Sequence, residues 1–193
     1  LGHWLGTVNT DWNNASNWPC GVIPTGTDNV VIAGSLPFYP VISTGTSSVN
    51  NLIIQSGASL TVNNMLQLAG TINNSGIFDV NNGTIELNGT SIQTVPAAAF
   101  AGNKIKNLII SNDVTLAGQD SMTNVLSFGA VDNKTFSTGG YLTLKSTAAG
   151  TAIVADLTNS DVNSGNQVLG DVTAERYLSS IKKWRFLTVP TNS

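Results

Sequence analysis

The residues that could form a nucleophile–base pair are few in this chain. His3 is the only histidine and Cys20 is the only cysteine. A Cys–His dyad needs the thiol and the imidazole to meet, with a third group to orient them, and nothing in the sequence supplies that group. Because a single cysteine makes no internal disulfide, we interpret Cys20 as a small buried side chain or an incidental thiol. His3 is interpreted as a surface residue or a tag remnant.

Acidic and amide side chains that could bind Ca²⁺ gather between residues 156 and 171. They are Asp156, Asn159, Asp161, Asn163, Asn166 and Asp171. Oxygen ligands of this kind suit Ca²⁺, but their spacing matches no known calcium loop, and solvated turns are the better interpretation. The sequence contains no phosphate-binding glycine loop, nucleophile elbow or His/Cys metal cluster. We therefore expect no cofactor, no metal and no catalytic residue.

Charge is sparse and unevenly distributed along the 193 residues. Charged residues make up 10% of the chain, against about 25% in typical soluble proteins. The net charge is −3, and all eight Lys and Arg residues lie in residues 104–193. So little positive charge argues against a nucleic-acid partner. No apolar run reaches the ~18 residues of a membrane span, so no membrane span is expected.

Short apolar runs of β type recur from residue 30 to residue 154. Most follow an apolar–x–apolar pattern, which places two side chains on the same face of a strand. Between them lie Asn-Asn, Asn-Gly, Ser-Gly and Ala-Gly pairs, which tolerate left-handed turns. No segment has a helical period. The sequence predicts an all-β chain.

The spacing of these runs indicates the architecture. Between residues 50 and 90 the strand centres are about six to eight residues apart, closer than in most antiparallel sandwiches. This spacing predicts a right-handed parallel β-helix with three short strands per coil and about 20 residues per coil. Residues 51–60 also resemble residues 107–116, as a repeat would. At this period, residues 30–170 would form roughly seven coils.

The composition suits such a stack, because Asn, Thr and Ser can pair in register between coils whereas like charges repel. The alternation of each run predicts which side chains face the core. Those expected to face inward are Leu52, Ile54, Leu60, Val62, Leu66, Leu68, Ile85, Leu87, Leu108, Ile110, Leu142 and Leu144. Those expected to face outward are Ile53, Thr61, Gln67, Glu86 and Thr143.

The two ends of the chain differ from its middle. Residues 1–28 contain Trp4, Trp12 and Trp18, three of the four tryptophans. Because the end of a coil stack must be covered, residues 1–28 are predicted to form an N-terminal capping segment. Residues 29–170 would form the coils, and residues 171–193 a C-terminal cap or the start of a following domain. The apolar insertion at residues 95–102 is expected to pack over a face or to form a contact patch.

Three pairs of segments, taken in their order, resemble the repetitive secreted and cell-surface proteins of Bacteroidetes that type IX secretion exports. The segments are residues 11–18 with 23–32, residues 83–93 with 107–110, and residues 175–178 with 184–187. The resemblance implies a right-handed β-helix stalk within a large adhesin-like protein that is secreted, extracellular or at the cell surface. Because the chain begins at Leu1 without a methionine, we interpret it as a processed piece of a longer protein.

The expected function is a non-enzymatic structural or adhesive module of such a surface protein. Its expected partners are surface glycans or other cell-surface proteins, with end-to-end association of copies as a further option. The alternative is a carbohydrate-binding module that uses exposed aromatic side chains as a platform for sugars. The candidate glycan-contacting aromatic residues are Trp4, Trp12, Phe38 and Tyr39.

A polysaccharide lyase or hydrolase is the less favoured alternative. Right-handed β-helices include pectate lyases and polygalacturonases, but a fold does not settle a function. Such lyases need basic residues beside Ca²⁺ and an acidic sugar, and residues 1–103 contain no Lys or Arg. Asn9, Thr10 and Asp11 match one fragment of the polygalacturonase signature, but the paired carboxylates of a hydrolase do not follow. We expect any adhesion to use contacts spread over several coils.

One modification site is also implied by resemblance. Asp120, Ser121 and Met122 resemble the Asp-Ser/Thr-apolar acceptor that the same bacteria use for O-glycosylation of exported proteins. The resemblance implies that Ser121 is a candidate O-glycosylation site.

Overall fold

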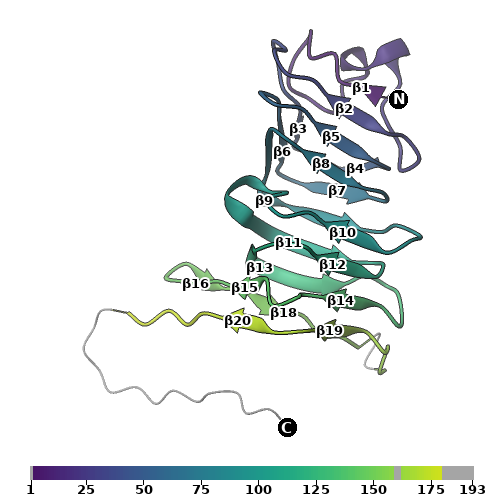
Figure 1. The fold of residues 1–193 in the computed structure, drawn as a ribbon. Helices are drawn as coiled ribbons and strands as arrows, with labels where there is room; N and C mark the ends of the chain where they lie inside the picture. The colour runs from purple at the N-terminus through teal and green to yellow at the C-terminus, as the bar shows by residue number, and fades with distance from the viewer. Residues whose placement is uncertain (1, 159–161, 180–193) are drawn as a thin grey trace.

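The chain folds as a parallel β-solenoid of about 21 residues per turn (Figure 1). The computed structural model describes residues 2–158 and 162–179. Within these residues the turns stack on one another from the N-terminal end, purple in Figure 1, to the yellow C-terminal end. The all-β class and the parallel coil predicted from strand spacing are confirmed. No helix among the described residues is long and apolar enough to cross a membrane.

The described residues contain twenty strands and three 3-10 helices. The strands are β1 (Gly2–His3), β2 (Val30–Ile32), β3 (Val41–Ile42), β4 (Thr46–Val49), β5 (Leu52–Ile54), β6 (Ser59–Val62), β7 (Met65–Leu68), β8 (Ile72–Asn74), β9 (Ile77–Leu87), β10 (Gln93–Val95), β11 (Lys104–Ile110), β12 (Val114–Leu116), β13 (Asp120–Phe128), β14 (Thr135–Ser137), β15 (Leu142–Leu144), β16 (Ser146–Thr147), β17 (Gly150–Thr151), β18 (Ile153–Val154), β19 (Gln167–Leu169) and β20 (Val172–Ala174). The helices are η1 (Ala15–Asn17), η2 (Pro19–Gly21) and η3 (Ala101–Asn103).

Three stacks of strands run along the solenoid. One stack consists of two four-stranded sheets, in the orders β1-β2-β5-β8 and β10-β12-β14-β19. The other two stacks begin as β3-β6 and β4-β7 and meet in the long strand β9, whose first part pairs with β6 and whose second part pairs with β7. Strands β11 and β13 continue from β9. Every pairing between turns is parallel in the part of the chain that the structure describes.

The length of a turn follows from the residues that pair between turns. Leu52 pairs with Ile72, and Val114 pairs with Phe136, so these turns take 20 and 22 residues. Farther on, Phe136 pairs with Val168, a step of 32 residues. The structure has about five turns, so the expectation of roughly seven coils is wrong. The last turns are longer than the repeat because they carry insertions, among them the antiparallel hairpin β16–β17.

The interior is filled by the inward side chains of the alternating strands. Eleven of the twelve residues expected to face inward are buried, from Leu52 to Leu142. The exception is Leu144, which is half-buried and packs against the edge of the core. The five residues expected to face outward, including Glu86, are only partly buried. The period-2 pattern therefore assigned the two faces correctly in these strands.

The tryptophans of the leading segment close the N-terminal end of the core. Trp4, Trp12 and Trp18 are buried and pack as one cluster, with ring centroids 4.7 to 6.3 Å apart. The indole N–H of Trp18 donates to the Trp12 carbonyl at 2.7 Å, and that of Trp4 donates to the Phe38 carbonyl at 2.8 Å. The prediction of a Trp-rich N-terminal cap is confirmed.

The apolar insertion at residues 95–102 packs into the core, where Phe100 is buried with its ring centroid 5.2 Å from that of Phe78. Its buried side chains therefore cover the core, whereas Ala97, Ala98 and Gly102 are exposed. The predicted C-terminal segment 171–193 is described only as far as Ser179, so residues 184–187 lie outside the described residues.

Candidate functional site

Two of the four aromatic residues predicted to contact glycans lie in the core. Trp12 is 0% exposed and Trp4 is 2% exposed. A sugar stacks on an exposed ring face, and these faces are covered by the other tryptophans of the cluster. The prediction is therefore wrong for Trp4 and Trp12. Large apolar side chains suit a sugar platform and the cap of a coil stack equally well, and here they form the cap.

Phe38 and Tyr39 lie in the loop between β2 and β3. Phe38 is 41% exposed, and its backbone N–H donates to the Gly6 carbonyl at 3.2 Å. Tyr39 is half-buried, and its hydroxyl accepts from the Leu36 N–H at 3.4 Å. Phe38 is therefore the most exposed of the four predicted aromatic residues.

Ser121 lies in β13, between two buried neighbours. It is half-buried and pairs with Lys104 of the preceding turn and Thr143 of the following one. The flanking Asp120 and Met122 point into the core and are 2% and 0% exposed. The strand therefore turns Ser121 outward, but the acidic residue of the acceptor pattern is not on the surface.

The residues that could form a nucleophile–base pair lie on the surface of the N-terminal segment. His3 and Cys20 are both exposed, and no hydrogen bond joins them in the structure described. The interpretation of Cys20 as a buried side chain is wrong, because the residue lies in η2 with a positive φ of 58° and its thiol faces solvent.

Asn9 and Asp11 cap local turns in the same segment. The Asn9 side-chain oxygen accepts from the backbone N–H of Asp11, and the Asp11 carboxylate accepts from the N–H of Asn13. The buried side chain of Asn17 donates to both the Asn9 oxygen and the Asp11 carbonyl. The Asn9–Asp11 segment thus has a structural role in holding the tryptophan cap.

Acidic and amide residues between 156 and 171 form local turns or bond to the neighbouring turn. Asp156 accepts two bonds from Thr158, and Asn166 accepts from the Lys134 N–H and donates to the Val131 carbonyl. Asn159 and Asp161 lie outside the described residues. Among the residues that are described, no three His, Cys, Asp or Glu side chains lie close enough together to hold a metal ion.

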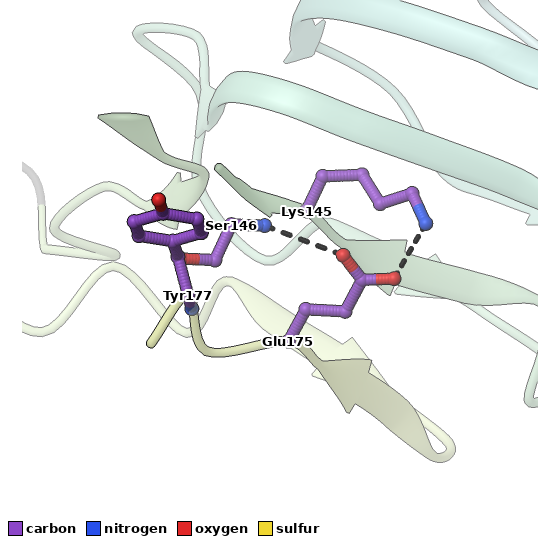
Figure 2. Close-up of polar contacts among 4 residues, drawn as sticks. All are labelled: Lys145, Ser146, Glu175 and Tyr177. Carbon is purple, nitrogen blue, oxygen red and sulfur yellow. Dashed lines mark hydrogen bonds and ion pairs between the residues drawn. The ribbon is translucent and has the colours of Figure 1, made fainter. Parts of the chain in front are cut away.

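A concave surface of mixed chemistry lies beside the hairpin β16–β17. A groove there is lined by hairpin residues and by the segment that follows β20. The lining residues are Ser146, Thr147, Thr151, Ala174, Glu175, Arg176 and Tyr177. Figure 2 shows the Tyr177 ring beside Ser146 and the Lys145–Glu175 pair on the other side of Ser146. The backbone N–H of Tyr177 donates to the Ser146 hydroxyl at 2.9 Å.

The charges at this groove are partly neutralised. The Lys145 ammonium lies 2.5 Å from the Glu175 carboxylate (Figure 2), and hydrogen bonding to Lys145 lowers the pKa of Glu175. The other carboxylate oxygen of Glu175 accepts from the Ser146 N–H at 3.5 Å. Arg176 is exposed at the rim. The groove therefore carries one positive charge beyond the ion pair.

Asp120 is the one strongly perturbed acid in the described structure. Neither of its carboxylate oxygens has a hydrogen-bond partner, and burial raises the pKa of this carboxyl to about 7. Its backbone N–H donates to the Tyr141 carbonyl at 3.0 Å. Desolvation is the cause of this shift, so protonation of Asp120 is coupled to the stability of the fold.

Sequence reasoning missed the groove beside the hairpin. The sequence predicts a C-terminal cap or the start of a following domain for the segment that contains Glu175, Arg176 and Tyr177, and it predicts no hairpin. A signal was present: residues 145–151, which are polar or small, interrupt the apolar repeat immediately after Leu144. What no pattern could show is that this insertion and residues 174–177 lie side by side one turn apart.

Comparison with models of protein families finds a match over the N-terminal part of the chain. A family described as "Domain of unknown function (DUF8693)" matches residues 3–107, just over half of the chain. The matched part includes the tryptophan cap and the turns as far as β11, but not the hairpin groove. No curated protein and no solved structure matches the chain.

Proposed function

The chain belongs to the DUF8693 family, and from that premise and its solenoid fold we propose that it is a non-enzymatic structural or adhesive module of a large secreted, cell-surface bacterial protein. The observation that carries the proposal is the hydrogen bonding of the polar side chains that face outward from the strands. They bond mainly to the next turn of the stack, as a rod requires, and do not converge on a reactive centre.

Two ladders of side chains support this view. In one ladder Ser48 donates to Gln67 at 2.9 Å and Gln67 donates to Glu86 at 2.8 Å, each from one turn to the next. Ser111 adds a bond of 2.7 Å to the other Glu86 oxygen. In the second ladder Asn51 donates to Asn29 at 2.7 Å and accepts from the Thr71 hydroxyl at 2.9 Å. Bonds of this kind add to the backbone pairing along the axis and resist bending and extension.

Placement at the bacterial surface is supported by sequence order and composition. The segments that resemble exported Bacteroidetes surface proteins include the Trp12 and Trp18 region, which forms the buried cap. A polar surface with few charges suits an extended module whose turns stack in register. Such a module holds a partner-binding region away from the cell, or contacts surface glycans or other surface proteins along its length.

The location can be tested on intact cells that produce the parent protein. Antibodies raised against the purified module should label intact cells, and externally added protease should remove the label while a cytoplasmic marker is retained. If the antigen is found only after the cells are lysed, the proposed location is wrong.

The absence of catalysis is tested separately. Purified module is incubated with polygalacturonate and with neutral plant glucans, and the release of reducing ends and of unsaturated products is measured. We expect no release above buffer in either assay. Turnover that copurifies with the module and disappears in the Asp11→Ala variant would instead support the hydrolase alternative.

Carbohydrate binding without turnover is the second candidate function. The groove beside β16–β17 favours it, because an exposed tyrosine ring, hydroxyl groups and a guanidinium lie together there. This combination offers an apolar face with hydrogen-bonding groups around it, which is how proteins usually recognise small polar ligands.

A further inference from the structure

The hairpin β16–β17 is an addition to the solenoid that the stack does not need. It is the only antiparallel pairing in the described chain, with Ser146 opposite Thr151 and Thr147 opposite Gly150. Residues 147–151 are exposed, and the hairpin contributes no side chain to the core. The hairpin makes its turn longer than the repeat of about 21 residues. Because the insertion adds nothing to the core, its effect is on the surface, where it forms one wall of a groove.

The opposite wall comes from the segment after β20, and side-chain bonds fix the two walls together. The Ser146 hydroxyl accepts from the Tyr177 N–H at 2.9 Å and lies 2.7 Å from the Thr151 hydroxyl. Glu175 bonds to Lys145 and to the Ser146 N–H. The walls are therefore held by contacts 29 to 31 residues apart in the sequence, and Tyr177 is placed before any ligand arrives.

The groove presents three kinds of group to a ligand. The Tyr177 side chain is 47% exposed, so part of its ring is open for stacking. Thr147 and Thr151 are exposed on the hairpin. The Thr147 hydroxyl bonds to the Gly150 carbonyl and the Ala149 N–H, and the Thr151 hydroxyl bonds to that of Ser146, so each hydroxyl oxygen keeps acceptor capacity for a ligand. Because Glu175 is paired with Lys145, the guanidinium of Arg176 is the positive group left to bind an anion.

We propose that this groove binds a pyranose that carries a carboxylate, a hexuronate at the end or in the chain of an acidic polysaccharide. The C–H face of the ring stacks on Tyr177, as apolar sugar faces do on aromatic rings. The carboxylate lies at the ring edge, within reach of Arg176, whose planar guanidinium matches its two oxygens. The ring hydroxyls bond to Thr147 and Thr151.

This inference rests on the adhesive form of the proposed function and names its ligand class. It differs from the expectation of contacts spread over several coils, because it assigns recognition to one groove. It also explains why Lys145 and Glu175 pair: without Lys145, the Glu175 carboxylate would repel an acidic sugar at the same place.

The binding is tested by nuclear magnetic resonance on the purified 193-residue chain. Hyaluronan tetrasaccharide and trigalacturonate are the acidic probes, and their methyl esters are the matched neutral probes. We expect saturable shifts of the Ser146, Thr151 and Tyr177 amide signals with at least one acidic probe, and at least about tenfold weaker binding of its ester. Raising the salt concentration should weaken the acidic complex.

Variants identify the groups responsible. Tyr177→Ala should weaken the binding of the acidic probe at least tenfold, and Arg176→Gln should bring its affinity down to that of the ester. Tyr141→Ala is the matched aromatic control, since Tyr141 is 39% exposed but does not line the groove. Lys134→Gln is the matched charge control. Neither control should change binding.

Three results would overturn the inference. They are no saturable shift with either acidic probe, equal binding of acid and ester, and unchanged binding in Tyr177→Ala whose spectrum shows it to be folded. None of these results bears on the surface location or the absence of turnover, which have their own assays. A failure of the groove is therefore distinguishable from a failure of the proposed function.

Discussion

The side-chain amide of Gln67 donates a 2.8 Å hydrogen bond to the carboxylate of Glu86, one turn farther along the solenoid. The two residues occupy equivalent positions in β7 and β9, which pair in register. This pair shows how a charged residue is accommodated in the stack: the neighbours of Glu86 in the ladder are neutral hydrogen-bond donors. Glu86 has no like charge stacked on it, because glutamine lies on one side and a serine hydroxyl, from Ser111, bonds from the other.

Replacing Glu86 by alanine should weaken the stack modestly. The substitution removes two side-chain hydrogen bonds at a partly exposed site, and each is worth about 1 kcal/mol. We expect the free energy of unfolding in urea to fall by about 1 to 2 kcal/mol. Glu86→Gln, which keeps an acceptor oxygen, should lose less. Equal losses in the two variants would show that the ladder bonds do not stabilise the fold.

Replacing Trp18 by alanine should open the N-terminal end of the core. Trp18 is 1% exposed and donates to the Trp12 carbonyl at 2.7 Å. Large-to-small changes of this kind cost about 3 to 5 kcal/mol, and the loss should appear in thermal and urea unfolding. Phe38→Ala, at an exposed ring beside the same cap, is the control and should change stability little. A small effect of Trp18→Ala would contradict a capping role.

Asp120 should make the solenoid more stable in mild acid than in mild base. Burial raises the pKa of its carboxyl from 3.8 to about 7, so between these values the folded state keeps a proton that the unfolded state has lost. The contribution of the Asp120 carboxyl to the free energy of unfolding is fully present below pH 4 and is lost as the pH rises through 7. The full difference is roughly 4 kcal/mol at most.

Asp120→Asn is the variant that tests this dependence. Its amide has nearly the same shape and does not titrate, so unfolding in urea at pH 5 and at pH 8 should differ less than in the unsubstituted chain. Asp156→Asn is the control, because bonds from Thr158 lower the pKa of Asp156, so this carboxyl is ionised in both the folded and the unfolded state from pH 5 to pH 8 and adds no pH dependence there. The same pH dependence in Asp120→Asn and the unsubstituted chain would rule out Asp120 as its source.

Gly83 should not tolerate a side chain. It lies at the bend of β9, where the chain turns from one stack to the next, and a Cβ there would lie 2.4 Å from the Val62 carbonyl of the preceding turn. We expect Gly83→Ala to destabilise the fold by about 1 to 3 kcal/mol, measured by urea unfolding. Gly150→Ala is the control, since nothing lies within 4 Å of a Cβ there. Equal stability of the two variants would contradict the close approach.

Much of the fold could be predicted from the sequence because it depends on local alternation. In a strand such as β6, the positions of Leu60 and Val62 on one face follow from the period of two alone. The repeat length followed in the same way from the spacing of short runs. The number of turns did not, because insertions such as the one after Leu144 lengthen turns without disturbing the apolar–x–apolar pattern of the strands.

The candidate site could be predicted less well, because side-chain type does not reveal burial. Trp4 and Trp12 have the chemistry of a sugar platform and serve as a cap, which depends on where the first turn ends. Tyr177 was passed over because its neighbour Ser146 is 31 residues away in the sequence. Which residues meet between turns of unequal length depends on the lengths of the insertions. These lengths do not repeat along the sequence and so could not be predicted from the period.

The most direct test of a surface module that works without catalysis is the attachment of cells that display the parent protein. Attachment under flow would be compared between the unaltered protein, an in-frame deletion of residues 2–179, and single alanine substitutions at Asp79, Glu86, Asp132 and Asp156. The account predicts that the deletion reduces attachment strongly while the protein is still exported, and that each single substitution leaves it nearly unchanged. Unchanged attachment after the deletion, or loss of most attachment from one of the four substitutions, would contradict it.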